Sequence, residues 1–517
     1  MLKLKITWKN ISLILLFGIT LTKVILPQNS KPIVPFEKKI LQGLDATFKF
    51  DFEKSEKIFN SLIEKYPDSP AGYHFKSIQY LWKYLDSKND SDYASFINLS
   101  DSTIKKANNL LARDTVDTFL YYILGSSYSY RAVAFTRQES YLDAVLATKK
   151  SFSYLNNTIL IDSTCYDAYM GLGLFNFMIS QTPPALKWAQ RIAGIEGEKE
   201  KGIKFLKLAA YNGKFSKVEA LFYLSQILAE FNGEYDKAEK ILISLNSKYR
   251  KNILFNYSLA SFYLKLSKLD KSEVILNRIT NSTDTNFSQL IRYSNLSMAN
   301  IYFYRNNFDK ASGYYKIFLS DSSEDYYRGL AALRLGLCYS FSGDSLNASK
   351  YFELTDEGNS DIDDDRYAKI TGGRYLENPP DSLQRKIIFI RNLKEAGRYN
   401  EARDSLLILL KEGLSKPQLA EINLYLSDVS FHLDSLTQAF SYAISAIAND
   451  EGEKWIKPFA YYFAAYVSLK LNYLEDAKIY IERVKAYSDY FYENKLANML
   501  NALEYKLKIL KDAVAEH

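Results

Sequence analysis

Histidine is the side chain most often used for acid–base catalysis and zinc binding, and it occurs only three times in the 517 residues, as His74, His432 and His517. We expect none of them to pair with a second metal ligand at the i, i+4 spacing, or to adjoin a nucleophile. The sequence therefore predicts neither zinc binding nor histidine-based catalysis. We assign His74 and His432 to helix surfaces or to packing.

Two glycine motifs have part of the pattern of nucleotide-binding loops. Gly171 and Gly173 would open a dinucleotide fingerprint, but Asn176 stands where a third glycine is required, and no strand precedes them. The segment 197–202 has the glycine spacing of a phosphate loop, but Ile-Lys follows it instead of Lys-Ser or Lys-Thr. We therefore predict no cofactor, and we interpret the Gly171 and Gly173 pair as a point of close helix packing.

Serine and acidic residues complete the search for catalytic or metal-binding chemistry. Ser126 and Ser127 follow Gly125 but lack the flanking glycine of a nucleophile elbow, so we expect them to pack between helices. An acidic cluster lacks the glycine and closing Glu of a calcium loop and is interpreted as a solvated loop between repeats. Its members are Asp361, Asp363, Asp364 and Asp365. The sequence selects no catalytic residue, no cofactor-binding residue and no metal ligand.

The composition indicates long helices. Only 11 Pro and 21 Gly interrupt the chain, while 42 Tyr and 31 Phe recur at helical spacing. The formal charge of +6 is a small excess of 66 Lys and Arg over 60 Asp and Glu, without a basic stripe, so nucleic acid is not an expected partner. The two cysteines, Cys165 and Cys338, exclude a disulfide framework.

One short turn recurs along the chain: a bulky residue, two polar residues and then Ala or Ser. Copies end at Ser55, Ala238, Ser272, Ala311, Ala348, Ala402, Ala439 and Ala477, and the step from Ala238 to Ser272 is 34 residues. Twelve positions before the turn, a small residue should let two helices approach closely. Gly43, Ala260, Ala299, Gly336, Ser427 and Ala465 stand there, whereas Gln226 and Ile390 depart from the pattern. Four positions after the turn, a bulky residue should fill the space beside the next helix: Phe59, Leu242, Leu276, Tyr315, Phe352, Leu406 and Ile481.

These residues resemble the tetratricopeptide-repeat family. The resemblance implies an all-α, right-handed superhelical solenoid of antiparallel helix pairs, each burying its apolar face by stacking on its neighbours. We divide the chain into an N-terminal signal peptide or anchor, a divergent helical region, a tetratricopeptide-repeat array and a capping helix. Their bounds are 1–28, 29–216, 217–489 and 490–517. Within the divergent region, 119–211 resembles the inclusion-body-clearance/tetratricopeptide repeat family of the mitochondrial outer membrane, and Pro183 and Pro184 should start a loop there.

The N-terminus has the order of a secretory signal. Lys3, Lys5 and Lys9 precede an apolar stretch, residues 11–21, that Lys23 interrupts before it is long enough to span a membrane. We expect an exported protein that is periplasmic or associated with the cell envelope. A chain anchored in the membrane by an uncleaved N-terminal helix is the alternative, because no small-x-small cleavage site follows the apolar stretch.

We predict a non-enzymatic scaffold or adaptor of the bacterial cell envelope that binds a peptide or helix of a partner protein along the concave repeat face. Side chains on the first helix of each pair should line that face: Tyr223, Tyr257, Tyr293, Asn300, Phe303, Arg391, Tyr462 and Tyr466. For each of them, packing between repeats is the alternative. The alternative function is a helical-repeat enzyme, or a protein that binds a small ligand or glycan in a pocket within 119–211.

Overall fold

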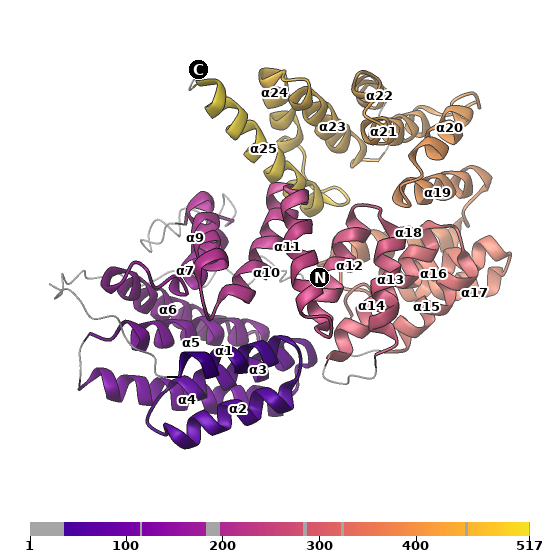
Figure 1. Cartoon of the computed structure of the whole chain (residues 1–517). Coiled ribbons are helices and arrows are strands. Elements are labelled where there is room, and N and C mark those ends of the chain that lie inside the picture. The colour runs from indigo at the N-terminus through magenta and orange to yellow at the C-terminus, as the bar shows by residue number, and fades with distance from the viewer. Residues whose placement is uncertain are drawn as a thin grey trace. The chain divides into compact units, whose positions relative to one another are not determined.

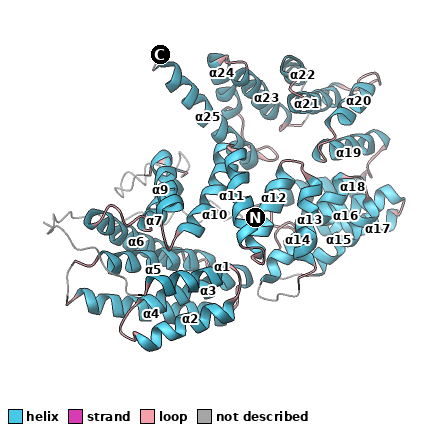
Figure 2. Ribbon diagram, in the orientation of Figure 1, coloured by secondary structure: helices cyan, strands magenta, loops and turns pink. Residues whose placement is uncertain are grey.

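The predicted all-α fold of paired helices is confirmed. The computed structural model describes residues 36–113, 116–181, 197–282, 287–321, 325–449 and 453–515, and within these ranges every regular element is a helix (Figure 2). Successive helices pack against each other along the chain, as Thr118–Arg137 does against Tyr141–Ile161 and Lys416–His432 against Leu436–Asn449. Residues 1–35, which hold the predicted signal, and Pro183 and Pro184 lie outside the described residues. No helix in the described ranges has the length and apolar character needed to cross a membrane.

The chain divides into two compact units. The first comprises residues up to 227 together with 236–256 and 283–290. Its helices, drawn in indigo to magenta in Figure 1, are α1 (Glu37–Phe48), α2 (Phe52–Lys65), α3 (Ala71–Ser87), α4 (Asp90–Leu111), α5 (Thr118–Arg137), α6 (Tyr141–Ile161), α7 (Ala168–Ser180), α9 (Lys199–Asn212), α10 (Lys217–Ile227) and nearly all of α11 (Tyr235–Lys248).

The second unit comprises 228–235, 257–282 and 291–517. It begins with the π-helix η3 (Leu228–Asn232) and takes most of α12 (Ile253–Lys265) and α14 (Ser288–Tyr304). The remaining helices are α13 (Leu269–Thr280), α15 (Phe308–Ser320), α16 (Arg328–Ser342), α17 (Ser345–Glu353), the 3-10 helix η5 (Leu354–Glu357), α18 (Asp363–Glu377), α19 (Ser382–Glu395), α20 (Tyr399–Leu409), α21 (Lys416–His432), α22 (Leu436–Asn449), α23 (Ile456–Lys470), α24 (Leu474–Lys485) and α25 (Glu493–Ala515).

The repeat pattern decides how each pair packs. The predicted small residues meet the following helix: Ser272 Oγ donates to the carbonyl of Ala260 over 2.8 Å, and Ser427 Oγ donates to that of Ala439 over 2.7 Å. At Gly336, an added Cβ would lie 2.6 Å from the Phe352 ring, so only glycine fits without displacing that ring. All seven predicted bulky residues after the turn are buried, none with more than 2% of its surface exposed. The pattern therefore predicted the close helix crossings correctly.

Two buried aspartates accept hydrogen bonds from backbone N–H groups at the starts of helices that are distant in the sequence. Asp365 accepts hydrogen bonds from the backbone N–H groups of Tyr327 and Leu330 at the start of α16, over 2.7 and 2.8 Å. Asp363 accepts from the N–H of Lys495 in the first turn of α25 over 3.2 Å. The interpretation of this acidic cluster as a solvated loop is therefore wrong for these two residues, which are 1% and 6% exposed. Their carboxylates satisfy N–H groups that a helix start leaves without partners.

Gly171 and Gly173 lie within α7 at close helix approaches, as expected. An added Cβ at Gly173 would lie 2.8 Å from the backbone N of Leu206 and 2.9 Å from the carbonyl of Gly202. At Gly171 it would lie 2.5 Å from the Leu155 side chain. The two glycines therefore hold α7 against α6 and α9.

Candidate functional site

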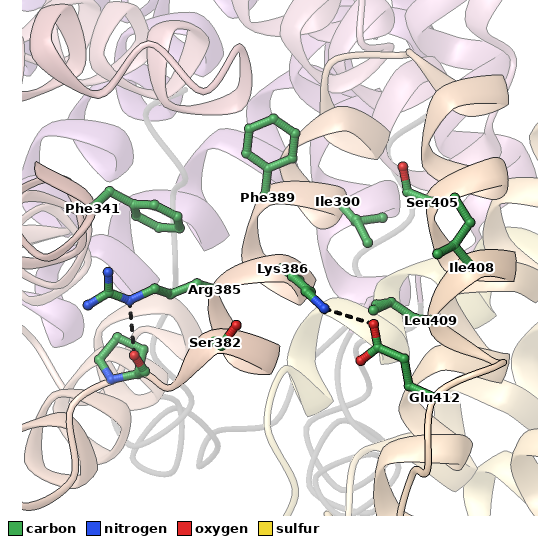
Figure 3. Close-up of a pocket in the computed structure, with 11 residues that line it drawn as sticks. Phe341, Ser382, Arg385, Lys386, Phe389, Ile390, Ser405, Ile408, Leu409 and Glu412 are labelled. Atoms are coloured by element: carbon green, nitrogen blue, oxygen red, sulfur yellow. Dashed lines mark hydrogen bonds and ion pairs between the residues drawn. The ribbon is translucent and has the colours of Figure 1, made fainter.

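An open groove in the second unit is a candidate binding site. It has a volume of about 820 Å³ and lies between α19 and α20, with α16 at one end (Figure 3). The end of α16 supplies Phe341, and the turn before α19 supplies Pro380. The two long sides come from α19 and from α20 with the residues that follow it: Ser382, Arg385, Lys386, Phe389, Ile390, Ser405, Ile408, Leu409 and Glu412.

Each side of the groove is one face of a helix. On α19 the lining residues recur at 385, 386, 389 and 390, and on α20 they recur at 405, 408 and 409, which is the spacing of a single helical stripe; Glu412 follows three residues after the end of α20. Ile390 and Leu409 form the floor and are 5% and 3% exposed. Phe389 and Ile408 stand above them and are 44% and 62% exposed. The groove thus presents apolar area to water at two large side chains.

The positive and negative charges at the groove do not balance. Lys386 and Glu412 face each other across it with their charged atoms 2.7 Å apart, so this pair is neutral. Arg385 donates from Nε to the carbonyl of Pro380 over 3.1 Å and from Nη2 to Ser340 Oγ over 3.3 Å. None of the described carboxylates lies within ion-pair distance of Arg385. The groove therefore carries one net positive charge near Phe341.

The residues predicted to bind a partner do not line this groove. They lie on five helices, α10, α12, α14, α19 and α23, and none of them is fully exposed. Tyr257, Phe303 and Tyr462 are buried, with 6%, 1% and 6% of their surfaces exposed. Tyr223, Tyr293, Asn300, Arg391 and Tyr466 are half-buried.

The half-buried members of this set already have neighbours within their own unit. Asn300 Oδ1 accepts hydrogen bonds from Tyr315 Oη over 2.8 Å and from Arg334 Nη1 over 2.5 Å. The Tyr466 ring lies 4.6 Å from that of Phe431. Such contacts are those of packing between repeats, and a role in partner binding stays a prediction for all eight residues.

His74 has hydroxyl neighbours that the sequence did not reveal. Its Nδ1 lies 2.8 Å from Ser127 Oγ and its Nε2 lies 3.3 Å from Ser126 Oγ, so the expectation that no histidine adjoins a nucleophile is wrong. Burial lowers the pKa of His74 to about 3, which leaves the ring a very weak base at neutral pH. All three side chains are buried, and the geometry is that of core packing.

His432 corrects a second expectation, because Asp428 lies four residues before it. His432 Nε2 is 3.3 Å from Asp428, and Lys394 Nζ is 2.6 Å from the same carboxylate. Burial alone would raise the pKa of Asp428, but Lys394 and His432 together lower it below its ordinary value. The carboxylate is thus held between the Lys394 ammonium group and the His432 ring. No set of three or more His, Cys, Asp or Glu side chains in the described ranges is arranged to hold a metal ion.

A known protein family matches part of the chain. Residues 126–370 match the family described as Iml2/Tetratricopeptide repeat protein 39. The match begins within 119–211 and continues well beyond residue 211, so the resemblance is wider than predicted from the sequence. No curated protein sequence matches the chain.

Among the solved structures that match the chain are three with low sequence identity. A tetratricopeptide repeat protein from Parabacteroides merdae is 15% identical, with 56% of this chain and 98% of that chain covered and a TM-score of 0.24. The APC/C heterotetramer Cut9-Hcn1 is 11% identical, with coverages of 90% and 96% and a TM-score of 0.25. The TPR domain of P58(IPK) is 12% identical, with coverages of 80% and 94% and a TM-score of 0.21.

The family match and the repeat residues agree. Helical repeats of this type are typical of protein–protein interaction scaffolds, because their stacked helices expose long surfaces without a catalytic centre of their own. The chain thus resembles the Iml2/Tetratricopeptide repeat protein 39 family over residues 126–370, and its recurring turn, with the small and bulky residues at fixed distances from it, resembles a tetratricopeptide repeat.

Proposed function

We propose that this protein is an exported, non-enzymatic scaffold of the bacterial cell envelope that binds a segment of a partner protein in the groove between α19 and α20. The observation that carries the proposal is the exposure of Phe389 and Ile408 in an open groove of about 820 Å³. Exposed large apolar side chains grouped in a concave surface are typical of binding sites. The eight residues named from the sequence are buried or half-buried, so the groove offers the more accessible contact.

Export is supported by the N-terminal sequence. Three lysines, Lys3, Lys5 and Lys9, precede the apolar residues 11–21, which is the order of a secretory signal. Fractionation of cells that express the full chain tests this part of the proposal. An exported form should appear in the periplasmic fraction, or in the membrane fraction when the N-terminal segment is retained, and recovery only from the cytoplasm would refute export.

Site-specific photo-cross-linking tests the groove itself. A photoreactive amino acid replaces Ile408, and a matched control carries the same residue at Leu346, which is 84% exposed and does not line the groove. We expect a discrete protein adduct from position 408 in native cells and none from position 346. The adduct should disappear when Phe389 is also changed to Ser. Equal labelling at both positions, or no protein adduct at all, would contradict binding in the groove.

A further inference from the structure

The geometry points to a specific kind of ligand for the groove: an amphipathic helix of a partner protein that carries Asp or Glu one helical turn from a bulky apolar residue. This inference rests on the proposed function, because it specifies the segment that the scaffold binds. It is carried by the shape of the groove and by the position of its unpaired charge.

The shape favours a helix as the ligand. Both walls are helical stripes, and a groove between two helices accepts the ridge of side chains along a third helix. The α19 wall extends from Ser382 to Ile390, eight steps along one helix, which corresponds to roughly 12 Å at 1.5 Å per residue. About two turns of a ligand helix fit along this length. Two apolar side chains at the i, i+3 or i, i+4 spacing would then contact Phe389 and Ile408 together.

The positive charge of Arg385 is the reason for expecting an acidic residue in the ligand. The guanidinium of Arg385 is half-buried and bonded only to neutral oxygens, those of Pro380 and Ser340. An arginine next to apolar surface can form a charge-assisted hydrogen bond with an incoming carboxylate. Lys386 is already neutralised by Glu412, so the single positive charge to be matched is that of Arg385.

The two recognition points lie one turn apart. Arg385 and Phe389 are four residues apart on α19, so their side chains lie on the same face, about 6 Å apart along the helix axis. Figure 3 shows Arg385 toward the Phe341 end and the Lys386–Glu412 pair on the opposite side of Phe389. A ligand helix that places an apolar side chain on Phe389 therefore brings a residue three or four positions away toward Arg385. An acidic residue there completes the charge match.

A displayed library of helical 14-residue peptides, selected against the full chain, tests the inference. Wild type should enrich peptides with Asp or Glu three or four positions from Leu, Ile, Met or Phe. Changing that acid to its amide in an enriched peptide should weaken binding about three- to tenfold. Selection against R385E should replace the acid by Lys or Arg, while R403E, a reversal on α20 outside the groove, should keep the wild-type preference.

The outcomes separate this inference from the function on which it rests. If wild type enriches peptides that bind F389S equally well, or that show no acid preference, the inference is wrong while a protein-binding scaffold stands. If wild type enriches no peptide at all, while a control receptor does under the same conditions, the proposed function fails too. Circular dichroism of F389S and R385E confirms the fold, and both changes are at residues that are not part of the buried core.

Discussion

Glu219 is a buried carboxylic acid in the first unit. Its carboxyl lies 2% exposed on α10 and accepts hydrogen bonds from Trp82 Nε1 on α3 over 3.2 Å and from Tyr130 Oη on α5 over 2.6 Å. Burial raises the pKa of Glu219 to about 7, even though both hydrogen bonds act to lower it. One acid therefore joins three helices, and its charge state affects the stability of this core.

Replacing Glu219 by Gln should change how stability depends on pH. The folded state holds the Glu219 proton more tightly than the unfolded chain, where the ordinary pKa is 4.5. Its contribution is therefore greatest below pH 4.5 and is lost as the pH rises through about 7. Between pH 4.5 and pH 8, wild type should lose about 2 to 4 kcal/mol more of its unfolding free energy than E219Q does. Urea unfolding at several pH values measures this difference, and parallel curves for the two proteins would show that Glu219 is not the responsible group.

The contacts that the sequence pattern predicts join residues that are close in the sequence, whereas the contacts that it misses join residues that are far apart. Gly336 and Phe352 are 16 residues apart within one repeat, so their contact follows from the period of the helices. Trp82 and Glu219 are 137 residues apart, and His74 and Ser127 are 53 apart. No local pattern relates side chains at such separations, because tertiary packing alone brings them together.

At the scale of the helix pair, the small residue at each crossing sets how closely two helices approach. Gly336 on α16 packs on Phe352 of α17, and an added Cβ would also lie 3.1 Å from the carbonyl of Ala348. By contrast, Gly373 on α18 has open space where its Cβ would be. Two helical glycines of the second unit thus form a matched comparison.

The substitution G336A should destabilise the protein by about 1 to 3 kcal/mol, since the Phe352 ring must move out of a packed core. The substitution G373A should stabilise it by about 0.5 to 1 kcal/mol, because alanine restricts the unfolded chain and fits the helix. Chemical denaturation of both variants against wild type measures the two effects. Similar effects of the same sign would mean that helix propensity, and not the crossing at Phe352, decides both.

A departure from the repeat pattern was the one signal that could have located the groove. Ile390 stands where six of the other copies have Gly, Ala or Ser, and it forms the groove floor together with Leu409. A large side chain at a crossing increases the distance between two helices. The exposure of Phe389 and Ile408, in contrast, follows from which helices lie beside α19 and α20. That arrangement depends on tertiary contacts, so the sequence pattern could not predict it.

At the scale of the whole molecule, a helical repeat is stabilised by the stacking of neighbouring helices. The destabilising effect of a substitution at one end should therefore decrease with distance along the array. In the second unit, α25 contacts η3, α18, α23 and α24, and it turns a buried stripe toward its neighbours. The stripe consists of Leu496, Leu500, Leu503 and Leu507. Ile509 on the same helix is 49% exposed.

The substitution L503A should cost about 2 to 5 kcal/mol locally, because it leaves a cavity against α23 and α24, whereas I509A should cost little. Hydrogen exchange measured peptide by peptide would follow the spread of the effect. We expect protection to fall most in α25 and in the elements that contact it, η3, α18, α23 and α24. It should fall less in α16, α17, α21 and α22, which pack on those elements, and least in α15 and α20, since each helix loses only the support that its neighbour provides. An equal loss of protection across the second unit would instead show that this unit unfolds as a single cooperative body, for which nearest-neighbour stacking is not an adequate description.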